Sequence, residues 1–199
     1  MKRLFLLFLV FFTISGFSQK TCFDDANGYR FSKLSESVDS LVARMEKAQS
    51  MVINCELPND SFLLMNGKKV KISEYKGKPL IINFWYIYCP PCVNEIPSFN
   101  ELAKKYADKI NILAISKDHK KQIEEFLLKR PFNVDMVADR EDYIIHHNIG
   151  AGYPCTIILD KEGKVVKFIN GANPAIDHQM DLYKEISPLI DTMLVNKKN

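Results

Sequence analysis

The stretch WYIYCPPC, Trp85–Cys92, lies where the apolar run Leu80–Tyr86 ends, and it places two cysteines three positions apart. The continuous apolar, β-rich run predicts a strand that is buried on both faces. From Pro90 to Tyr106 apolar residues recur at helical spacing, so a helix is expected to follow the strand at once. The two cysteines are therefore predicted to lie at a strand–helix junction.

This position has chemical consequences for the cysteine pair. The first turn of a helix carries unsatisfied N–H groups and the positive end of the helix dipole, which would stabilise a thiolate at Cys89 and lower its pKa. Cys92, one turn later, is close enough to attack a mixed disulfide formed by Cys89. Pro90 and Pro91 suit the first helical turn, where a missing N–H costs nothing. The spacing predicts a redox-active pair with Cys89 as nucleophile and Cys92 as resolving thiol.

Two other uses of the pair have to be weighed. A zinc site would need two further soft ligands, usually closely spaced, but Cys22, Cys55 and Cys155 are scattered and have no histidine within three residues. A purely structural Cys89–Cys92 disulfide would close a very small loop and restrict the unfolded chain little. Redox chemistry is the favoured interpretation, and no metal is expected.

The rest of the chain alternates between strand and helix patterns. Asn66-Gly67 is a dipeptide favoured in two-residue hairpin turns, and Asp118 is a candidate N-cap. The expected strands are a hairpin within 61–72 and the segments 80–86, 110–116, 133–137, 154–160 and 164–170; the expected helices are 90–106, 118–129, 140–149 and 174–195. This order predicts an α/β fold with a mixed central sheet flanked by helices on both faces.

The N-terminus reads as a targeting segment. Residues 1–18 combine a basic start with a short apolar run, which is typical of a cleaved secretory signal peptide; an uncleaved membrane anchor is the alternative. Removing them takes two of the 27 basic residues and none of the 24 acidic ones, which leaves a net charge of +1 (25 − 24). This near-neutral balance gives no support for nucleic-acid binding. We divide the remainder into an extension, residues 19–60, and a main domain, residues 61–199.

The extension carries a predicted amphipathic helix and two cysteines. The apolar face of this helix would consist of Val38, Leu41, Val42, Met45 and Val52. The helix is expected to pack on the main domain, with partner binding as the alternative. Five cysteines in an exported chain imply an oxidising compartment, and Cys22 and Cys55, which flank the helix, are candidates for a structural disulfide.

Two blocks resemble the TlpA/ResA-like periplasmic thiol-disulfide oxidoreductases of the thioredoxin superfamily. The first, INFWYIYCPPCVNEIP, matches the active-site segment of that family at Phe84, Trp85, Cys89, Pro91, Cys92, Glu95, Ile96 and Pro97, with Tyr88 in place of the usual tryptophan. The second, GAGYPCTIILDKEGKVV, is similar to the family's cis-proline strand. The resemblance covers about Ser61–Val195 and implies a thioredoxin-like fold with a helix–strand insertion, supplied here by residues 118–137.

The resemblance also implies roles for individual residues. Glu95 would assist proton transfer at Cys92, although a first-turn glutamate also simply favours the helix dipole. Pro154 would be cis, and the backbone of Tyr153 would pair with an extended segment of the partner. Cys155 stands where the family usually has threonine; it is either a buried core residue or an extra regulatory or resolving thiol. The implied partner-binding residues are Trp85, Tyr88, Pro90, Pro91, Tyr153 and Pro154.

The expected function is an exported, periplasmic enzyme that reduces disulfides in oxidised partner proteins. By resemblance it would draw electrons from a membrane thiol-disulfide donor, need no bound cofactor and have no stable membrane insertion once the signal is cleaved; cytochrome c biogenesis is one role known in the family. A disulfide-donating oxidase or isomerase would use the same residues, and a non-catalytic binding module remains the alternative of a different class. A peroxiredoxin-like peroxidase would need threonine where this chain has Tyr86.

Overall fold

The computed structural model describes residues 20–32, 37–171 and 182–195 of the chain. The predicted signal peptide and residues 174–181 of the predicted final helix lie outside these ranges. The described α-helices are α1 (Cys22–Arg30), α2 (Val38–Met51), α3 (Pro90–Tyr106), α4 (Lys120–Leu127), α5 (Glu141–His147) and α6 (Leu182–Val195). The described strands are β1 (Ser61–Leu63), β2 (Lys69–Lys71), β3 (Leu80–Trp85), β4 (Asn111–Ser116), β5 (Asp135–Val137), β6 (Cys155–Leu159) and β7 (Val165–Asn170). No helix in these ranges is long and apolar enough to span a membrane.

The central sheet has five strands in the order β5-β4-β3-β6-β7. β3 lies in the middle, parallel to β4 and antiparallel to β6. β4 is parallel to β5, whereas β6 and β7 form an antiparallel hairpin. This is the predicted mixed sheet, and the order of elements after the first hairpin is also as predicted. Every residue of β3 is buried, as a strand covered on both faces requires.

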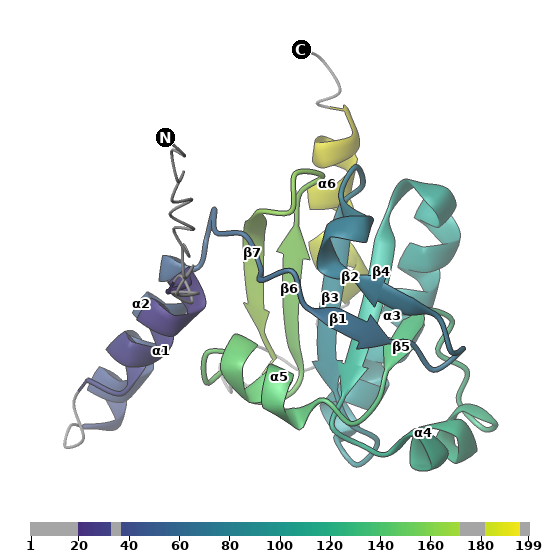
Figure 1. Cartoon of the computed structure of the whole chain (residues 1–199), viewed down its shortest axis with the longest axis horizontal. Coiled ribbons are helices and arrows are strands. Elements are labelled where there is room, and N and C mark those ends of the chain that lie inside the picture. Colours follow the sequence, from purple (N-terminus) through teal and green to yellow (C-terminus); the bar gives the residue numbers. More distant parts are fainter. Residues whose placement is uncertain (1–19, 33–36, 172–181, 196–199) are drawn as a thin grey trace, which may run out of the picture.

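Two hydrophobic clusters cover the two faces of the sheet. Because successive side chains of a strand point to opposite faces, β3 contributes to both clusters. Ile81 and Trp85 pack with α3 and α6, whereas Ile82 and Phe84 pack with the β1–β2 hairpin, α1 and α5. Figure 1 shows α3 and α6 behind the sheet and the hairpin and α5 in front of it.

The β1–β2 hairpin forms as predicted, but its turn differs from the expected two-residue turn at Asn66-Gly67. The N–H of Gly67 donates to the carbonyl of Leu64 (2.9 Å), so the turn is centred on Met65 and Asn66 and ends at Gly67. Gly67 has φ +88°, a conformation that glycine adopts without steric cost. The N–H of Leu64 also donates to the carbonyl of Lys68 (2.9 Å), so residues 65–67 form the loop between the two strands.

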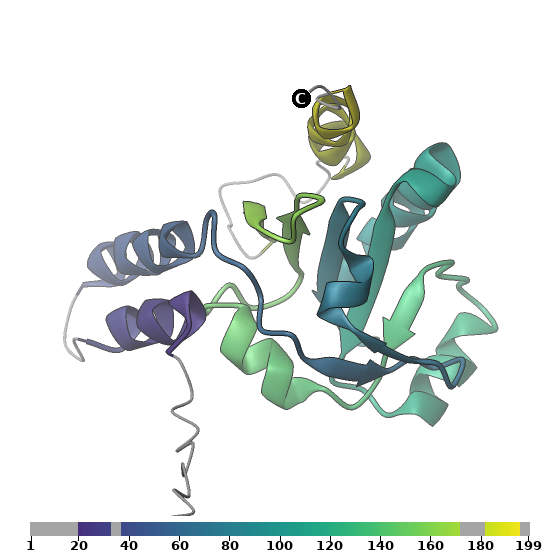
Figure 2. The ribbon, with the colours of Figure 1, turned by 45° about the horizontal axis from the view of Figure 1, so that its top comes forward.

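Two helices, rather than the single one expected, precede the hairpin. α2 covers the predicted amphipathic segment, but Val38, Leu41 and Val42 of its expected buried face are 75%, 45% and 48% exposed. The side that is buried instead carries Arg44 and Ala48. The reason is α1, which packs against α2 and selects a different side of it. Figures 1 and 2 show the two helices side by side, beyond the β7 edge of the sheet.

The first helix is tied down at both of its flanks. A disulfide joins Cys22, at the start of α1, to Cys55, just after α2, with the Cα atoms 6.3 Å apart. On the other flank, the ring of Phe23 lies 5.0 Å from that of His147 of α5. The side-chain amide of Asn27 also donates to the carbonyl of His146 (2.7 Å). The expected Cys22–Cys55 staple is thus present and holds the helix pair against the main body.

Replacing both Cys22 and Cys55 by serine is expected to lower the free energy of unfolding by roughly 2–4 kcal/mol, because a disulfide closing a loop of this length restricts the unfolded chain. The sequence separation of the two cysteines is 33. Urea unfolding of the double variant and of the unmodified chain, both oxidised, measures the difference. An unchanged denaturation midpoint would show that the staple does not stabilise the fold.

Candidate active site

The Cys89–Cys92 disulfide lies at the N-terminus of α3, directly after the central strand β3. The two Cα atoms are 5.2 Å apart. Cys89 is the N-cap residue of α3, and its sulfur accepts the backbone N–H of Cys92 (3.2 Å). Pro90 and Pro91 occupy the first helical positions, where an N–H would have no acceptor within the helix. An N–H group and the positive helix end therefore both act on the Cys89 sulfur, an arrangement that stabilises a thiolate there.

The disulfide itself is shielded, while the residues around it are accessible. Cys89 and Cys92 are only 3% and 2% exposed, whereas Tyr88 is 77% exposed. Pro90 is exposed and Pro91 is half-buried. A partner that approaches Cys89 would therefore first meet the Tyr88 ring and the two prolines.

Trp85 does not belong to the accessible surface: of the two roles that the sequence suggests for it, partner binding and core packing beside the active site, its burial supports core packing. It is fully buried, with its ring 5.7 Å from that of Phe126 and 5.5 Å from that of Phe132. Its place in β3 points its side chain into the cluster shared with α3 and α4. Trp85 is a core residue in the same hydrophobic cluster as Cys89 and Cys92.

Glu95 is a carboxyl group held in an apolar position one turn beyond Cys92. Residues three apart on a helix share a face, so Glu95 lies on the Cys92 side of α3. Its Oε2 atom is buried and has no hydrogen-bond partner among the described residues. Burial, reinforced by the negative charge of Glu185, raises the pKa of Glu95 to about 8. The carboxyl group is therefore mostly neutral at pH 7. Its pKa lies close enough to neutral pH for the group both to donate and to accept a proton.

The second block of the resemblance lies at the same edge of the sheet. The Tyr153–Pro154 peptide bond is cis, as the resemblance implied. β6 pairs with β3 so that Cys155 faces Phe84. Two residues beyond this pair, the rings of Tyr153 and Tyr86 meet edge to face with their centres 4.9 Å apart. The cis-proline segment and the segment leading to Cys89 are thus in direct contact.

Asp118 anchors the loop that carries the cysteines and is not the helix N-cap that we expected. Its carboxylate accepts the backbone N–H of Ile87 (2.7 Å) and the hydroxyl of Ser116 (2.9 Å). α4 begins two residues later, with His119 as its N-cap residue. The carboxylate does not cap α4 because β4 ends beside β3, where the N–H of Ile87 needs a hydrogen-bond acceptor. The sequence showed that Asp118 follows a strand, but it did not show which strand lies beside that one.

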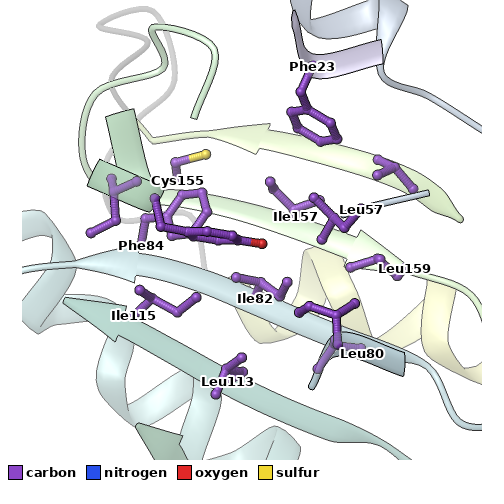
Figure 3. Packing of buried hydrophobic residues seen from close by; sticks show 14 of the residues in the cluster. Phe23, Leu57, Leu80, Ile82, Phe84, Leu113, Ile115, Cys155, Ile157 and Leu159 are labelled. Carbon is purple, nitrogen blue, oxygen red and sulfur yellow. The ribbon is translucent and has the colours of Figure 1, made fainter. Parts of the chain in front are cut away.

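Cys155 is not brought to the cysteine pair. It is a free thiol, and its residue is 1% exposed. Its side chain belongs to the cluster with Phe84 and Ile157, on the opposite face of the sheet from Cys89 and Cys92; Figure 3 shows its sulfur among these apolar side chains. Burial raises the pKa of the Cys155 thiol well above its usual range, so it stays protonated. This geometry favours the interpretation of Cys155 as a core residue over that of an extra redox thiol.

Nothing in the described part of the chain gathers three or more side chains able to hold a metal ion. The groups at this edge of the sheet that could take part in a reaction are the two cysteine sulfurs and the buried carboxyl group of Glu95. A disulfide at a helix N-terminus, a cis-proline segment in contact with the residues that lead to it, and a mixed central sheet define the class of thioredoxin-fold thiol-disulfide oxidoreductases.

Comparisons with known proteins agree with this class. Residues 48–168 match the model of the AhpC/TSA family, and the chain belongs to this family. The thiol-disulfide oxidoreductase ResA of Bacillus thuringiensis subsp. konkukian is 33% identical over 149 residues, which cover 71% of this chain and 83% of that protein. The chain is thus a thiol-disulfide oxidoreductase.

Solved structures support the fold independently. The thiol:disulfide interchange protein DsbE of Chlorobium tepidum superposes with a TM-score of 0.60 at 22% identity, over 70% of this chain and 95% of that one. A protein disulfide isomerase of Bacteroides thetaiotaomicron superposes with a TM-score of 0.58 at 21% identity, over 70% and 90%. At these identities the likeness speaks for the thioredoxin-like fold alone.

Proposed function

We propose that this chain reduces disulfide bonds in partner proteins, with Cys89 as the attacking thiol and Cys92 as the resolving thiol. The observation that carries the proposal is the Cys89–Cys92 disulfide at the N-terminus of α3 with a neutral carboxyl group, Glu95, on the same face of the helix. These are the groups that a two-step thiol-disulfide exchange requires.

The reaction starts from the reduced pair. The Cys89 thiolate attacks one sulfur of the partner's disulfide, which forms a mixed disulfide and releases the partner's first thiolate. The Cys92 thiolate then attacks the Cys89 sulfur, which forms the Cys89–Cys92 bond and releases the partner's second thiolate. Two electrons pass to the partner, and its two sulfurs take up two protons. The donated N–H of Cys92 and the helix dipole act at the Cys89 sulfur in both steps.

Glu95 is proposed to exchange the proton of the buried Cys92 sulfur. Charging Cys92 in an apolar site is costly, so it needs a base when it attacks and an acid when it leaves. In the oxidised enzyme Glu95 is neutral at pH 7, because its pKa is about 8. It can therefore protonate the Cys92 thiolate when an electron donor opens the disulfide, and then accept that proton back in the next cycle.

The backbone of Tyr153 is proposed to hold the partner. Tyr153 is half-buried and lies before cis-Pro154 at the edge that carries the cysteines. An extended partner segment can add to such an edge through main-chain hydrogen bonds. Tyr88, Pro90 and Pro91 are the other accessible residues that such a segment would meet.

The cellular setting is part of the proposal. Residues 1–18 are proposed to export the chain to the periplasm, where it would act as a soluble enzyme, and a thiol-disulfide donor in the membrane is proposed to reduce Cys89–Cys92 after each cycle. The Cys22–Cys55 disulfide supports an oxidising compartment, since such bonds persist there and are rare in the cytosol. A role in cytochrome c biogenesis would follow from a partner of that pathway.

Turnover of a disulfide-bonded substrate tests the assignment of the thiols. With dithiothreitol as electron donor, the chain is expected to accelerate the reduction of insulin, and the Cys89→Ser variant is expected to fall to the rate of dithiothreitol alone. Cys155→Ser serves as the matched control and is expected to retain the activity, because Cys155 lies in the opposite cluster. Activity that survives in Cys89→Ser would contradict the assignment and favour a binding module.

A further inference from the structure

Lys117 lies at the docking edge, the edge of the sheet where a partner segment is proposed to pair with Tyr153, and it has no role in the exchange reaction itself. Lys117 follows directly after β4, and the parallel register of β3 and β4 pairs Trp85 with Ser116. Tyr86 and Lys117 therefore leave neighbouring strands at the same level. The antiparallel register of β3 and β6 brings Tyr153 to that level as well. Three side chains distant in sequence are thus fixed together by the strand pairing.

The ammonium group of Lys117 lies over both aromatic rings. Its Nζ is 4.4 Å from the ring centre of Tyr86 and 5.5 Å from that of Tyr153. Both distances fall within the range of cation–π attraction. The two rings support each other edge to face, and all three residues are half-buried. The positive charge is held in one place, beside the residue that precedes cis-Pro154.

This charge has no carboxylate partner among the described residues, since none of their ion pairs includes Lys117. The neighbouring Asp118 is occupied by the Ile87 N–H and the Ser116 hydroxyl. Asp118 and Glu141 act on the Tyr153 side, where they add to burial in raising the pKa of Tyr153. These negative charges oppose a further acidic group beside Tyr153, so an acidic group of a partner would have to meet the Lys117 ammonium itself, which keeps its N–H donors for a charged acceptor.

We propose that Lys117, clamped over Tyr86 and Tyr153, selects partner proteins that carry an acidic side chain next to the target disulfide. The inference rests on the proposed docking of partners along Tyr153. A partner segment that pairs with the Tyr153 backbone would place its neighbouring side chains over the two tyrosine rings. A glutamate or aspartate there can form a charge-assisted hydrogen bond with the Lys117 ammonium, whereas an amide forms a weaker, neutral-acceptor one.

The test compares two disulfide-bonded peptides that differ only in a glutamate or glutamine next to one cysteine. The chain is expected to reduce the glutamate peptide with a kcat/KM roughly tenfold higher than that of the glutamine peptide at low salt, which corresponds to about 1.4 kcal/mol of binding. This ratio should shrink as salt is added, because charge interactions at an accessible site are screened. In Lys117→Met the ratio is expected to fall to about one, and in Lys117→Arg it is expected to persist.

Lys104→Met provides the control for net charge. It removes the same charge from an exposed position in the last turn of α3, away from the docking edge, and should keep the ratio of the unmodified chain. A ratio near one in the unmodified chain, or a preference that survives in Lys117→Met, would overturn the inference while turnover itself upholds the proposed function. Failure to reduce either peptide would overturn the proposed function and the inference together.

Discussion

Replacing Cys92 by serine is expected to arrest the enzyme as a covalent complex with its partner. Cys89 keeps the stabilising N–H and helix end, so it can still attack the partner's disulfide. No thiol in the described structure is placed to resolve the mixed disulfide, because the free Cys155 lies in the opposite cluster of the sheet. Multiple turnover should fall to background, and one partner molecule should be trapped per enzyme molecule.

Non-reducing electrophoresis followed by mass spectrometry of the linked peptides measures this trapping. The Cys89→Ser variant should trap nothing, and the Cys92→Ser, Cys155→Ser double variant should trap as much as Cys92→Ser does. If Cys92→Ser continued to turn over and the double variant did not, Cys155 would be a resolving thiol. The placement of Cys155 given above would then be wrong.

The substitution Glu95→Gln is expected to stabilise the oxidised protein while slowing it. The pKa of Glu95 is about 8 in the folded chain, well above the ordinary value near 4.3 that it has when unfolded. Between these two pKa values the unfolded state binds fewer protons than the folded state, so the free energy of unfolding falls as the pH rises. The contribution of the neutral Glu95 carboxyl group is fully present below about pH 4.3 and is lost as the pH rises through about 8. A glutamine is neutral throughout and removes this loss. At pH 7 the gain is expected to reach about 3 kcal/mol.

The same substitution should slow disulfide exchange on the order of 10²-fold, because general acid–base assistance at the Cys92 sulfur is removed. Stopped-flow reduction of the Cys89–Cys92 disulfide across pH 6–10 measures this, with urea unfolding as the second readout. Glu101→Gln, on the exposed side of the same helix, is the matched control and should change neither quantity. An unchanged rate and an unchanged pH dependence of stability in Glu95→Gln would show that Glu95 neither exchanges the proton of Cys92 nor titrates with a raised pKa.

The order of strands and helices was predictable because the core strands are recognisable in the sequence. The runs that became β3, β4 and β6 are rich in apolar and β-forming residues, which is typical of strands buried on both faces; the polar Asn83 and Thr156 within them are buried and hydrogen-bonded to each other (3.1 Å). The cysteine pair was predictable for a related reason, since a strand that ends just before C-x-x-C leaves the pair at the start of a helix. The cis bond at Pro154 came from the resemblance and not from composition.

Other features depended on tertiary neighbours that no local pattern reveals. The buried side of α2 is set by α1, whose short polar sequence gave no helical signal, so Leu41 and Val42 were placed on the wrong face. Asp118 was read as a helix cap because its role as acceptor for Ile87 arises only when β4 lies beside β3. The meeting of Lys117 with Tyr86 and Tyr153 likewise follows from strand register, which periodicity alone does not supply.

The redox equilibrium of the Cys89–Cys92 pair tests the central claim most directly. The chain would be equilibrated in buffers of reduced and oxidised glutathione, and the fraction of paired thiols measured by alkylation, with Cys89→Ser as the blank. A reductase should have a potential near or below that of thioredoxin, roughly −270 mV. A value near roughly −120 mV, typical of DsbA, would make the chain a disulfide donor and would contradict the proposed direction of electron flow.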